Sequence, residues 1–248
     1  MGVPLIQNRV IAGTATAPAP LVGSAAQARA ALRRWFLWTT AGEVAGFTVP
    51  AVTGVLTVTS PAPAAWSALV LAGAIEGAAL GWAQASALRP LLPRIDRRRF
   101  TALTSVAAMV AYAVAMTPSV MGERLLQTPA WIVVPACVVA ATVLLGSIGF
   151  AQWLELRRLL PHPASWIGWT ALAWTLGLSS FMAVAVPLWH EDQAAAAAIA
   201  VAVTAAFVMA VVVALVTGAA LLRLVRRMPA QLVRRDHPEP DHSSPTTT

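Results

Sequence analysis

Six long apolar stretches dominate this chain, and each is long enough to cross a lipid bilayer. A transmembrane helix needs about 20 apolar residues to cross a hydrocarbon core of about 30 Å. An open segment in lipid satisfies its own backbone hydrogen bonds only as a helix. The sequence therefore predicts an all-α polytopic membrane protein with six transmembrane helices. The stretches cover residues 35–58, 64–88, 100–119, 129–156, 166–189 and 193–226.

The composition points to the same class of protein. Of the 248 residues, 58% are hydrophobic and only 11% are charged, whereas soluble domains are about 25% charged. The net charge of +7 does not indicate nucleic-acid binding, because the arginines occur in short groups between the apolar stretches. We therefore expect the lipid bilayer to be the main partner of this chain and expect no nucleic acid.

The arginines also predict how the chain is oriented. All 17 basic residues are arginine, and all but Arg124 fall on one side of the predicted spans. Cytoplasmic loops of membrane proteins carry an excess of basic residues, so we expect both termini to lie in the cytoplasm. We expect residues 1–34 to form a partly disordered N-terminal tail, 35–227 the transmembrane domain and 228–248 a disordered C-terminal tail.

The ends of alternate stretches repeat the same residues. Residues 81–93 read GWAQASALRPLLP, and residues 149–161 read GFAQWLELRRLLP, 68 positions later. A weaker copy at 218–229 follows after another 69 positions, with Leu221 in place of the glutamine. Each of the other three stretches opens with an aromatic–threonine pair: Trp38-Thr39, Phe100-Thr101 and Trp169-Thr170. Because all copies end on the arginine side, the pattern predicts three tandem helical hairpins in parallel orientation.

One copy of this ending is similar to a known group of proteins. Its sequence, Gln152-Trp153-Leu154-Glu155-Leu156-Arg157 after Gly149, resembles the GxxQWLxLRxxxP ending repeated in uncharacterised six-span bacterial membrane proteins. The resemblance covers residues 35–227, although Ala85-Ser86 replaces Trp-Leu in the first copy. The group has no assigned activity. The resemblance therefore implies a bacterial plasma membrane and a six-helix architecture, and it implies nothing about chemistry.

Two acidic residues fall inside the first predicted hairpin. Glu43 follows Arg34 by nine residues and Glu76 precedes Arg89 by thirteen, so they should lie about 13 and 20 Å from the arginine side. A charge at the bilayer centre costs about 3 kcal/mol, and the apolar parts of the spans contain no basic residue. We expect each carboxyl group to be protonated, or to face water or a bound cation.

Two interpretations of this acidic pair stay open. In the first, Glu43 and Glu76 form a proton or cation site, with Gln84 and the hydroxyl groups of Thr39 and Thr40 close by. In the second, a protonated glutamic acid makes a hydrogen bond across the hairpin and only stabilises it. Mid-span aromatic residues such as Tyr112 and Trp174 are interpreted as packing residues.

Small and amide side chains predict where the helices pack. Gly73, Gly77 and Gly81 are spaced four residues apart on one stretch, a pattern that lets helix backbones approach closely. The alternatives are that these glycines line a permeation path or meet a partner protein. Gly149 is expected to pack similarly. Gln84 and Gln152 each precede a boundary arginine by five residues, and we expect both to make interhelical hydrogen bonds.

Polar residues near the ends of the spans are interpreted as solvated groups. Glu155 with its neighbouring arginines is expected to form a solvated or snorkelling cluster near the membrane interface. The adjacent residues His190, Glu191 and Asp192 could bind a metal together with Glu123, but three consecutive loop residues seldom face one ion. We therefore interpret this segment as an ordinary polar loop and expect no metal site.

Catalytic patterns are missing from the sequence. It contains no Walker A, HExxH or Rossmann glycine pattern, and no histidine falls inside a predicted span. We expect no enzyme activity and no cofactor. The leading hypothesis is a non-enzymatic membrane component: an accessory, scaffold or lipid-interacting protein. The alternative is a small transporter or channel for protons, cations or a small solute that uses Glu43 and Glu76. A membrane-protein partner and a homo-oligomer both remain open.

Overall fold

The structure, a computed structural model, describes residues 25–161, 163–190 and 192–226. Within these ranges the chain is all-helical, which confirms the all-α part of the predicted fold class. It forms α1 (Ala25–Leu56), α2 (Ala62–Leu88), α3 (Arg97–Met121), α4 (Glu123–Gln127), α5 (Ala130–Leu156), α6 (Ser165–Leu188) and α7 (Ala195–Arg226). The long helices match the predicted stretches within a few residues except at the start of α1. Residues 25–34, predicted as part of the tail, continue that helix, and residues 1–24 and 227–248 lie outside the described ranges.

Local sequence signals set several helix ends. Asp96 precedes α3, and its side chain accepts a hydrogen bond of 3.1 Å from the backbone N–H of Arg99, which satisfies a free donor of the first turn. Pro61 and Pro129 precede α2 and α5. Proline has no backbone N–H, and at the start of a helix that group would have no hydrogen-bond partner within the helix. Gly122, with φ of +52°, forms the turn from α3 into α4. The short helix α4 was not predicted from the sequence.

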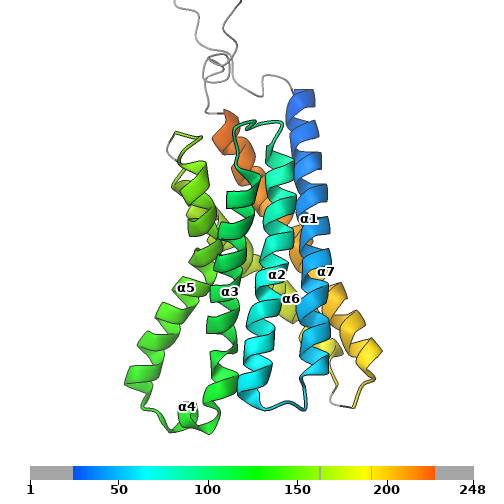
Figure 1. Cartoon of the computed structure of the whole chain (residues 1–248), viewed down its shortest axis with the longest axis vertical. Coiled ribbons are helices and arrows are strands. Elements are labelled where there is room, and N and C mark those ends of the chain that lie inside the picture. Colours follow the sequence, from blue (N-terminus) through cyan, green and yellow to red (C-terminus); the bar gives the residue numbers. More distant parts are fainter. Residues whose placement is uncertain (1–24, 162, 191, 227–248) are drawn as a thin grey trace, which may run out of the picture.

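The six long helices form a closed ring (Figure 1). Each packs against the next in the order α1, α2, α3, α5, α6 and α7, and α7 then packs against α1. Successive long helices run in opposite directions. The first and last helices of the described chain therefore lie side by side.

One end of the ring, here called the arginine end, holds every described arginine except Arg124. At this end α1 begins, α7 ends and the connections α2–α3 and α5–α6 lie. An apolar cluster with members from all six long helices packs here. Its large members include Trp35, Leu88, Phe100, Leu156, Trp166 and Val225. The helices are therefore held together most tightly at the arginine end.

Packing becomes looser toward the opposite end of the ring. The buried residues of α5 all lie between Ile148 and Leu156, and those of α3 all lie between Phe100 and Ala108. Figure 1 shows α5 moving away from α3 as both approach α4. The helix ring is therefore wider at the end near α4 than at the arginine end.

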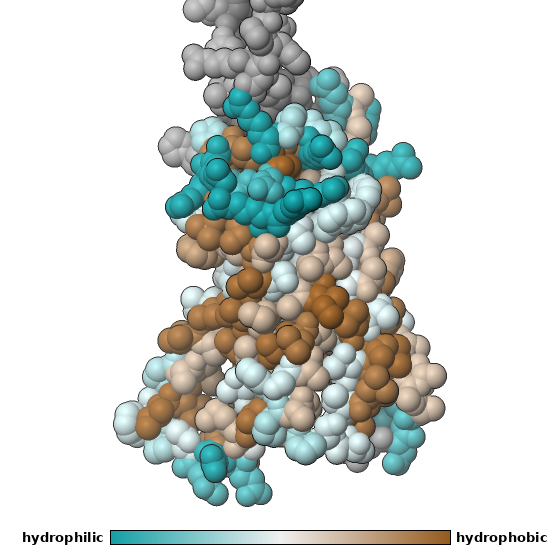
Figure 2. Space-filling view, in the orientation of Figure 1, coloured by the Kyte–Doolittle hydropathy of each residue, from teal (hydrophilic) through white to brown (hydrophobic). Residues whose placement is uncertain are grey.

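The surface has the polarity of a membrane protein. Figure 2 shows polar bands near both ends of the molecule with an apolar belt between them. Among the described residues, five helices are long and apolar enough to cross a bilayer: α2, α3, α5, α6 and α7. The sixth long helix, α1, is not among the five, because Glu43 and several threonines and glycines lower its apolar content. The chain thus has the architecture of a multi-pass membrane protein.

Candidate functional site

The two acidic residues of the first hairpin lie next to each other where α1 crosses α2. A methyl group added at Gly46 would lie only 3.0 Å from the Cα atom of Glu76, so the two helices touch at this point. Glu43 is one turn away from Gly46 on α1. Glu43 is 0% exposed and Glu76 is 5% exposed, so both acids are buried at this helix crossing.

The two carboxyl groups have different partners. The hydroxyl group of Tyr112, on α3, donates a hydrogen bond of 2.5 Å to Oε2 of Glu76. Neither carboxyl oxygen of Glu43 has a hydrogen-bond partner among the described residues. Among the described residues, no arginine forms an ion pair with Glu43 or Glu76; Arg99 and Arg158 form ion pairs with Glu155 instead. Two adjacent negative charges without a cation are unfavourable in apolar surroundings, so this pair must hold a proton or a cation.

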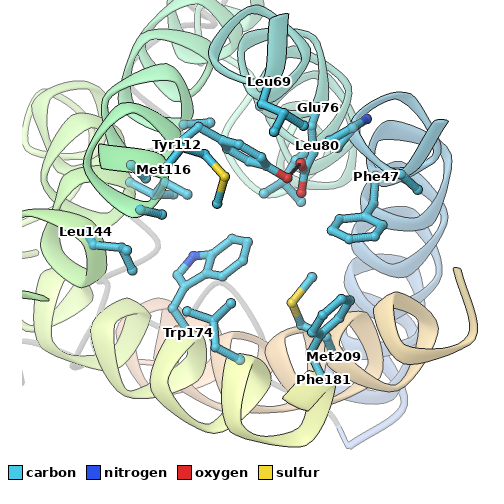
Figure 3. A pocket seen from close by; sticks show the side chains of 18 residues that line it. Phe47, Leu69, Glu76, Leu80, Tyr112, Met116, Leu144, Trp174, Phe181 and Met209 are labelled. Atoms are coloured by element: carbon cyan, nitrogen blue, oxygen red, sulfur yellow. Dashed lines mark hydrogen bonds between the residues drawn. The ribbon is translucent and has the colours of Figure 1, made fainter. Parts of the chain in front are cut away.

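A cavity of about 320 Å³ opens inside the helix ring beside Glu76 (Figure 3). All six long helices contribute to its wall. Among the described residues that line the cavity, Glu76 is the one with a charged side chain, and Glu43 is not part of the wall. The lining residues are Phe47, Pro50, Ala51, Leu69, Glu76, Gly77, Leu80, Ala108, Ala111, Tyr112, Ala115, Met116, Leu144, Ile148, Trp174, Leu178, Phe181 and Met209.

Aromatic side chains surround the acid in this cavity. Figure 3 shows Tyr112 next to Glu76, with Phe47 on the neighbouring helix and Trp174 across the opening. Phe47 packs edge-on against Phe181, with ring centroids 5.4 Å apart. Phe47, Tyr112 and Phe181 are partly exposed, as expected for side chains that line a cavity.

A buried hydrogen-bond network lies between this cavity and the arginine end. Nε2 of Gln152 donates to Oε1 of Gln84 at 2.6 Å and to the hydroxyl of Thr104 at 3.4 Å. Nε1 of Trp166 donates to Oε1 of Gln152 at 3.0 Å. Trp166 in turn packs edge-on against Trp35, with centroids 5.8 Å apart. The network and the apolar cluster beyond it close the ring on this side.

This arrangement separates Gln84 from the acidic pair. Gln84 lies eight residues after Glu76 on α2, which is about 12 Å along the helix, and its amide oxygen is bonded to Gln152. Thr39 and Thr40 lie within about one turn of Glu43 on α1, and both hydroxyl groups are buried without a described partner. Of the sequence-predicted neighbours, only the two threonines lie close to the acids.

The glycines meet a neighbouring helix of the same chain. Gly73, Gly77 and Gly81 all face α3, where an added methyl group would collide with Tyr112, Ala108 and Thr104 respectively. Gly149 faces α6 in the same way, at Ile167 and Thr170. The hypothesis that the first three glycines meet a partner protein is therefore wrong, because α3 covers them.

The interpretation of Glu155 as a solvated group is also wrong. Its side chain is 2% exposed and forms ion pairs with Arg99 at 3.3 Å and Arg158 at 3.4 Å. It also accepts a hydrogen bond from the backbone N–H of Asp96 at 3.3 Å. The start of α3 covers the end of α5, a tertiary contact that the local sequence does not reveal.

The polar loop after α6 forms no metal centre among the described residues. No group of three histidine, cysteine or acidic side chains in the described ranges is arranged to hold a metal ion. His190 and Asp192 belong to those ranges, whereas Glu191 lies outside them.

Most residues of the cavity wall could not be identified from the sequence. Tyr112 was interpreted as a packing residue, yet it bonds to Glu76 from a different helix. Phe47, Phe181, Met116 and Met209 gave no signal, because apolar residues in a lipid-embedded helix look alike whether they face lipid or the ring interior. Comparison with protein-family models, curated proteins and solved structures finds no match to this chain.

Proposed function

We propose that this chain is a non-enzymatic membrane protein that binds a lipophilic small molecule inside its helix ring. The observation that carries this proposal is the cavity of about 320 Å³ walled by all six long helices. Sites for small molecules are typically concave, mostly apolar and about 300–1,000 Å³ in volume, with a few polar groups that fix orientation. Glu76 and Tyr112 are such groups here.

We further propose that all six long helices cross a bacterial plasma membrane as three tandem hairpins, with the arginine end in the cytoplasm. The antiparallel packing of α1 between α2 and α7 supports a sixth crossing. A glycine at each junction between hairpins supports the repeat: Gly81 packs on Thr104, Gly149 on Thr170 and Gly218 on Trp35. Cysteines at positions 98 and 123 test the orientation, and an impermeant maleimide should label only the second in intact cells.

The cavity is tested with a neutral apolar probe such as neopentylbenzene. The protein is labelled with 5-fluorotryptophan and placed in nanodiscs, and the ¹⁹F signal of Trp174 is assigned by a Trp174→Phe variant. We expect the probe to shift this signal in a saturable way. This protein-based signal distinguishes occupation of the cavity from partition of the probe into lipid.

A filled cavity should lose this response. Ala111 lines the cavity on α3, so Ala111→Phe should abolish the shift. The matched control is Ala102→Phe, at an exposed position of the same helix outside the cavity wall, which should leave the shift unchanged. A wild-type signal that does not respond, or responds equally in both variants, would contradict the proposed function.

Transport is the second candidate function, and the buried acidic pair beside the cavity favours it. A proton, a cation or a small solute could use Glu43 and Glu76 as a binding step, but a path to the arginine end would require opening the layer of Gln84 and Gln152. Proton and cation flux into liposomes tests this candidate. A wild-type flux that Glu76→Gln leaves unchanged would rule out a mechanism centred on this acid.

A further inference from the structure

We infer that the ligand of the cavity is a lipophilic cation, meaning an ammonium or related onium group carried on an aromatic or alkyl body. This inference rests on the proposed function and adds the charge of the ligand to it. It is carried by the placement of one buried acidic pair beside an apolar, aromatic-lined cavity.

The acidic pair can supply a negative charge that no described arginine matches. Glu76 reaches the cavity wall. Glu43, at the same crossing of α1 and α2, has both carboxyl oxygens buried without a described hydrogen-bond partner. The described part of the chain places no arginine against either group. A cation in the cavity would replace the missing counter-charge, whereas an anion would be repelled by the same pair.

The aromatic side chains suit the rest of such a ligand. Phe47, Tyr112, Trp174 and Phe181 come from three helices and surround the space in front of Glu76 (Figure 3). Aromatic faces attract a cation within about 6 Å of the ring centroid, and quaternary ammonium groups are recognised in this way. The thioethers of Met116 and Met209 add polarizable surface that adapts to ligand shape.

A bare metal ion suits the site poorly. Calcium binds six to eight oxygen ligands and magnesium keeps an octahedral set. The described cavity wall offers side-chain oxygens only from Glu76 and Tyr112. An organic cation does not need a full oxygen shell, because its apolar body is stabilised by the same wall that a hydrated ion avoids.

Two probes of the same shape separate charge from burial. Benzyltrimethylammonium carries a permanent positive charge, and neopentylbenzene is its neutral carbon counterpart. Both are titrated against 5-fluorotryptophan-labelled protein in nanodiscs, with the Trp174 signal as the readout. We expect the cation to bind at least about tenfold more tightly than the neutral probe.

Variants then locate the charge. Glu76→Gln should reduce the affinity for the cation by about tenfold or more and leave the affinity for neopentylbenzene unchanged. The matched control is Glu123→Gln, the same chemical change at the exposed start of α4, which should leave both affinities unchanged. The comparison of the two probes on the wild-type protein needs no variant, so it still decides the question if Glu76→Gln fails to fold.

The possible results separate recognition of the ligand's charge from occupation of the cavity. Saturable binding of neopentylbenzene that equals or exceeds that of the cation would overturn this inference and leave the proposed function intact. Loss of both affinities to the same degree in Glu76→Gln would also overturn it, since the residue would then shape the cavity without recognising charge. If neither probe shifts the wild-type signal, the proposed function itself is contradicted and this inference falls with it.

Discussion

Gln152 is the residue on which the buried network at the arginine end depends. Its amide group donates to Gln84 and Thr104 and accepts from Trp166, so it connects α5 to α2, α3 and α6. Gln84, Thr104 and Trp166 are all buried inside the helix ring. Removing Gln152 would leave the oxygen of Gln84 and the indole N–H of Trp166 without their partner, and a buried polar group left unsatisfied costs more than the bond itself contributes.

We therefore predict that Gln152→Leu lowers the free energy of unfolding by about 1–3 kcal/mol. The measurement is reversible unfolding in mixed micelles. Gln84→Leu should have a similar effect, and the double variant should lose less than the sum of the two, because with both amides replaced neither is left without the other. Strictly additive losses would show that the two amides do not stabilise each other.

The sequence predicts part of this residue-level arrangement. The equal distance of Gln84 and Gln152 from their boundary arginines indicates one depth and suggests interhelical hydrogen bonds. Their bond to each other also requires α2 and α5 to face the same interior, with α3 between them in the ring order. The hydrogen bond from Tyr112 to Glu76 was unpredictable for the same reason, since hydropathy gives the depth of a residue and not the direction it faces.

At the scale of helices, the contact of α1 with α2 depends on small residues on α1. Gly46 brings the backbone of α1 against Glu76, and a methyl group there would lie 3.0 Å from both the Cα and the carbonyl oxygen of that residue. Backbone atoms cannot rotate away as a side chain can. Gly54, near the end of the same helix, has nothing within 4 Å of such a methyl group. The two glycines therefore form a matched pair.

We predict that Gly46→Ala destabilises the protein by about 1–3 kcal/mol, because α1 and α2 must separate. Gly54→Ala should leave stability unchanged or raise it by up to about 1 kcal/mol, because alanine restricts the unfolded chain and favours helix. Unfolding of both variants under identical conditions provides the measurement. Equal effects of the two substitutions would contradict the close approach of the helices at Gly46.

Helix positions follow from the sequence more readily than helix contacts. Apolar length and boundary arginines predict five of the long helices within a few residues. The sequence predicts residues 25–34 only as part of a partly disordered tail, because they are polar enough to resemble one. In the structure they extend α1, and Ala28 packs into the apolar cluster at the arginine end. Burial of Glu155 was missed as well, since it depends on the start of a helix more than 50 residues earlier.

At the scale of the whole molecule, ring closure creates the cavity. Hairpin loops are short enough to predict that successive helices are neighbours, but no local signal predicts that α7 returns to α1. That contact includes the hydrogen bond of 3.0 Å from Nε1 of Trp35 to the hydroxyl of Thr217, two positions separated by 182 residues. Without it the six helices would form an open row, and Met209 would not reach the same cavity as Phe47.

Chemical cross-linking between α1 and α7 tests this closure most directly. Cysteines replace Leu32 and Gly218 in a protein that carries Cys137→Ser. The two positions are close, because a methyl group added at Gly218 would lie 3.3 Å from the side chain of Leu32. The matched control pairs the same Leu32→Cys with Gly146→Cys on α5, a glycine that faces open space on a helix that is not a ring neighbour of α1. A short bifunctional maleimide is added to membranes, and mass spectrometry identifies the linked peptides. We expect an efficient link within one chain for the first pair and none for the control. A first pair that links only between chains, or no better than the control, would contradict the closed ring.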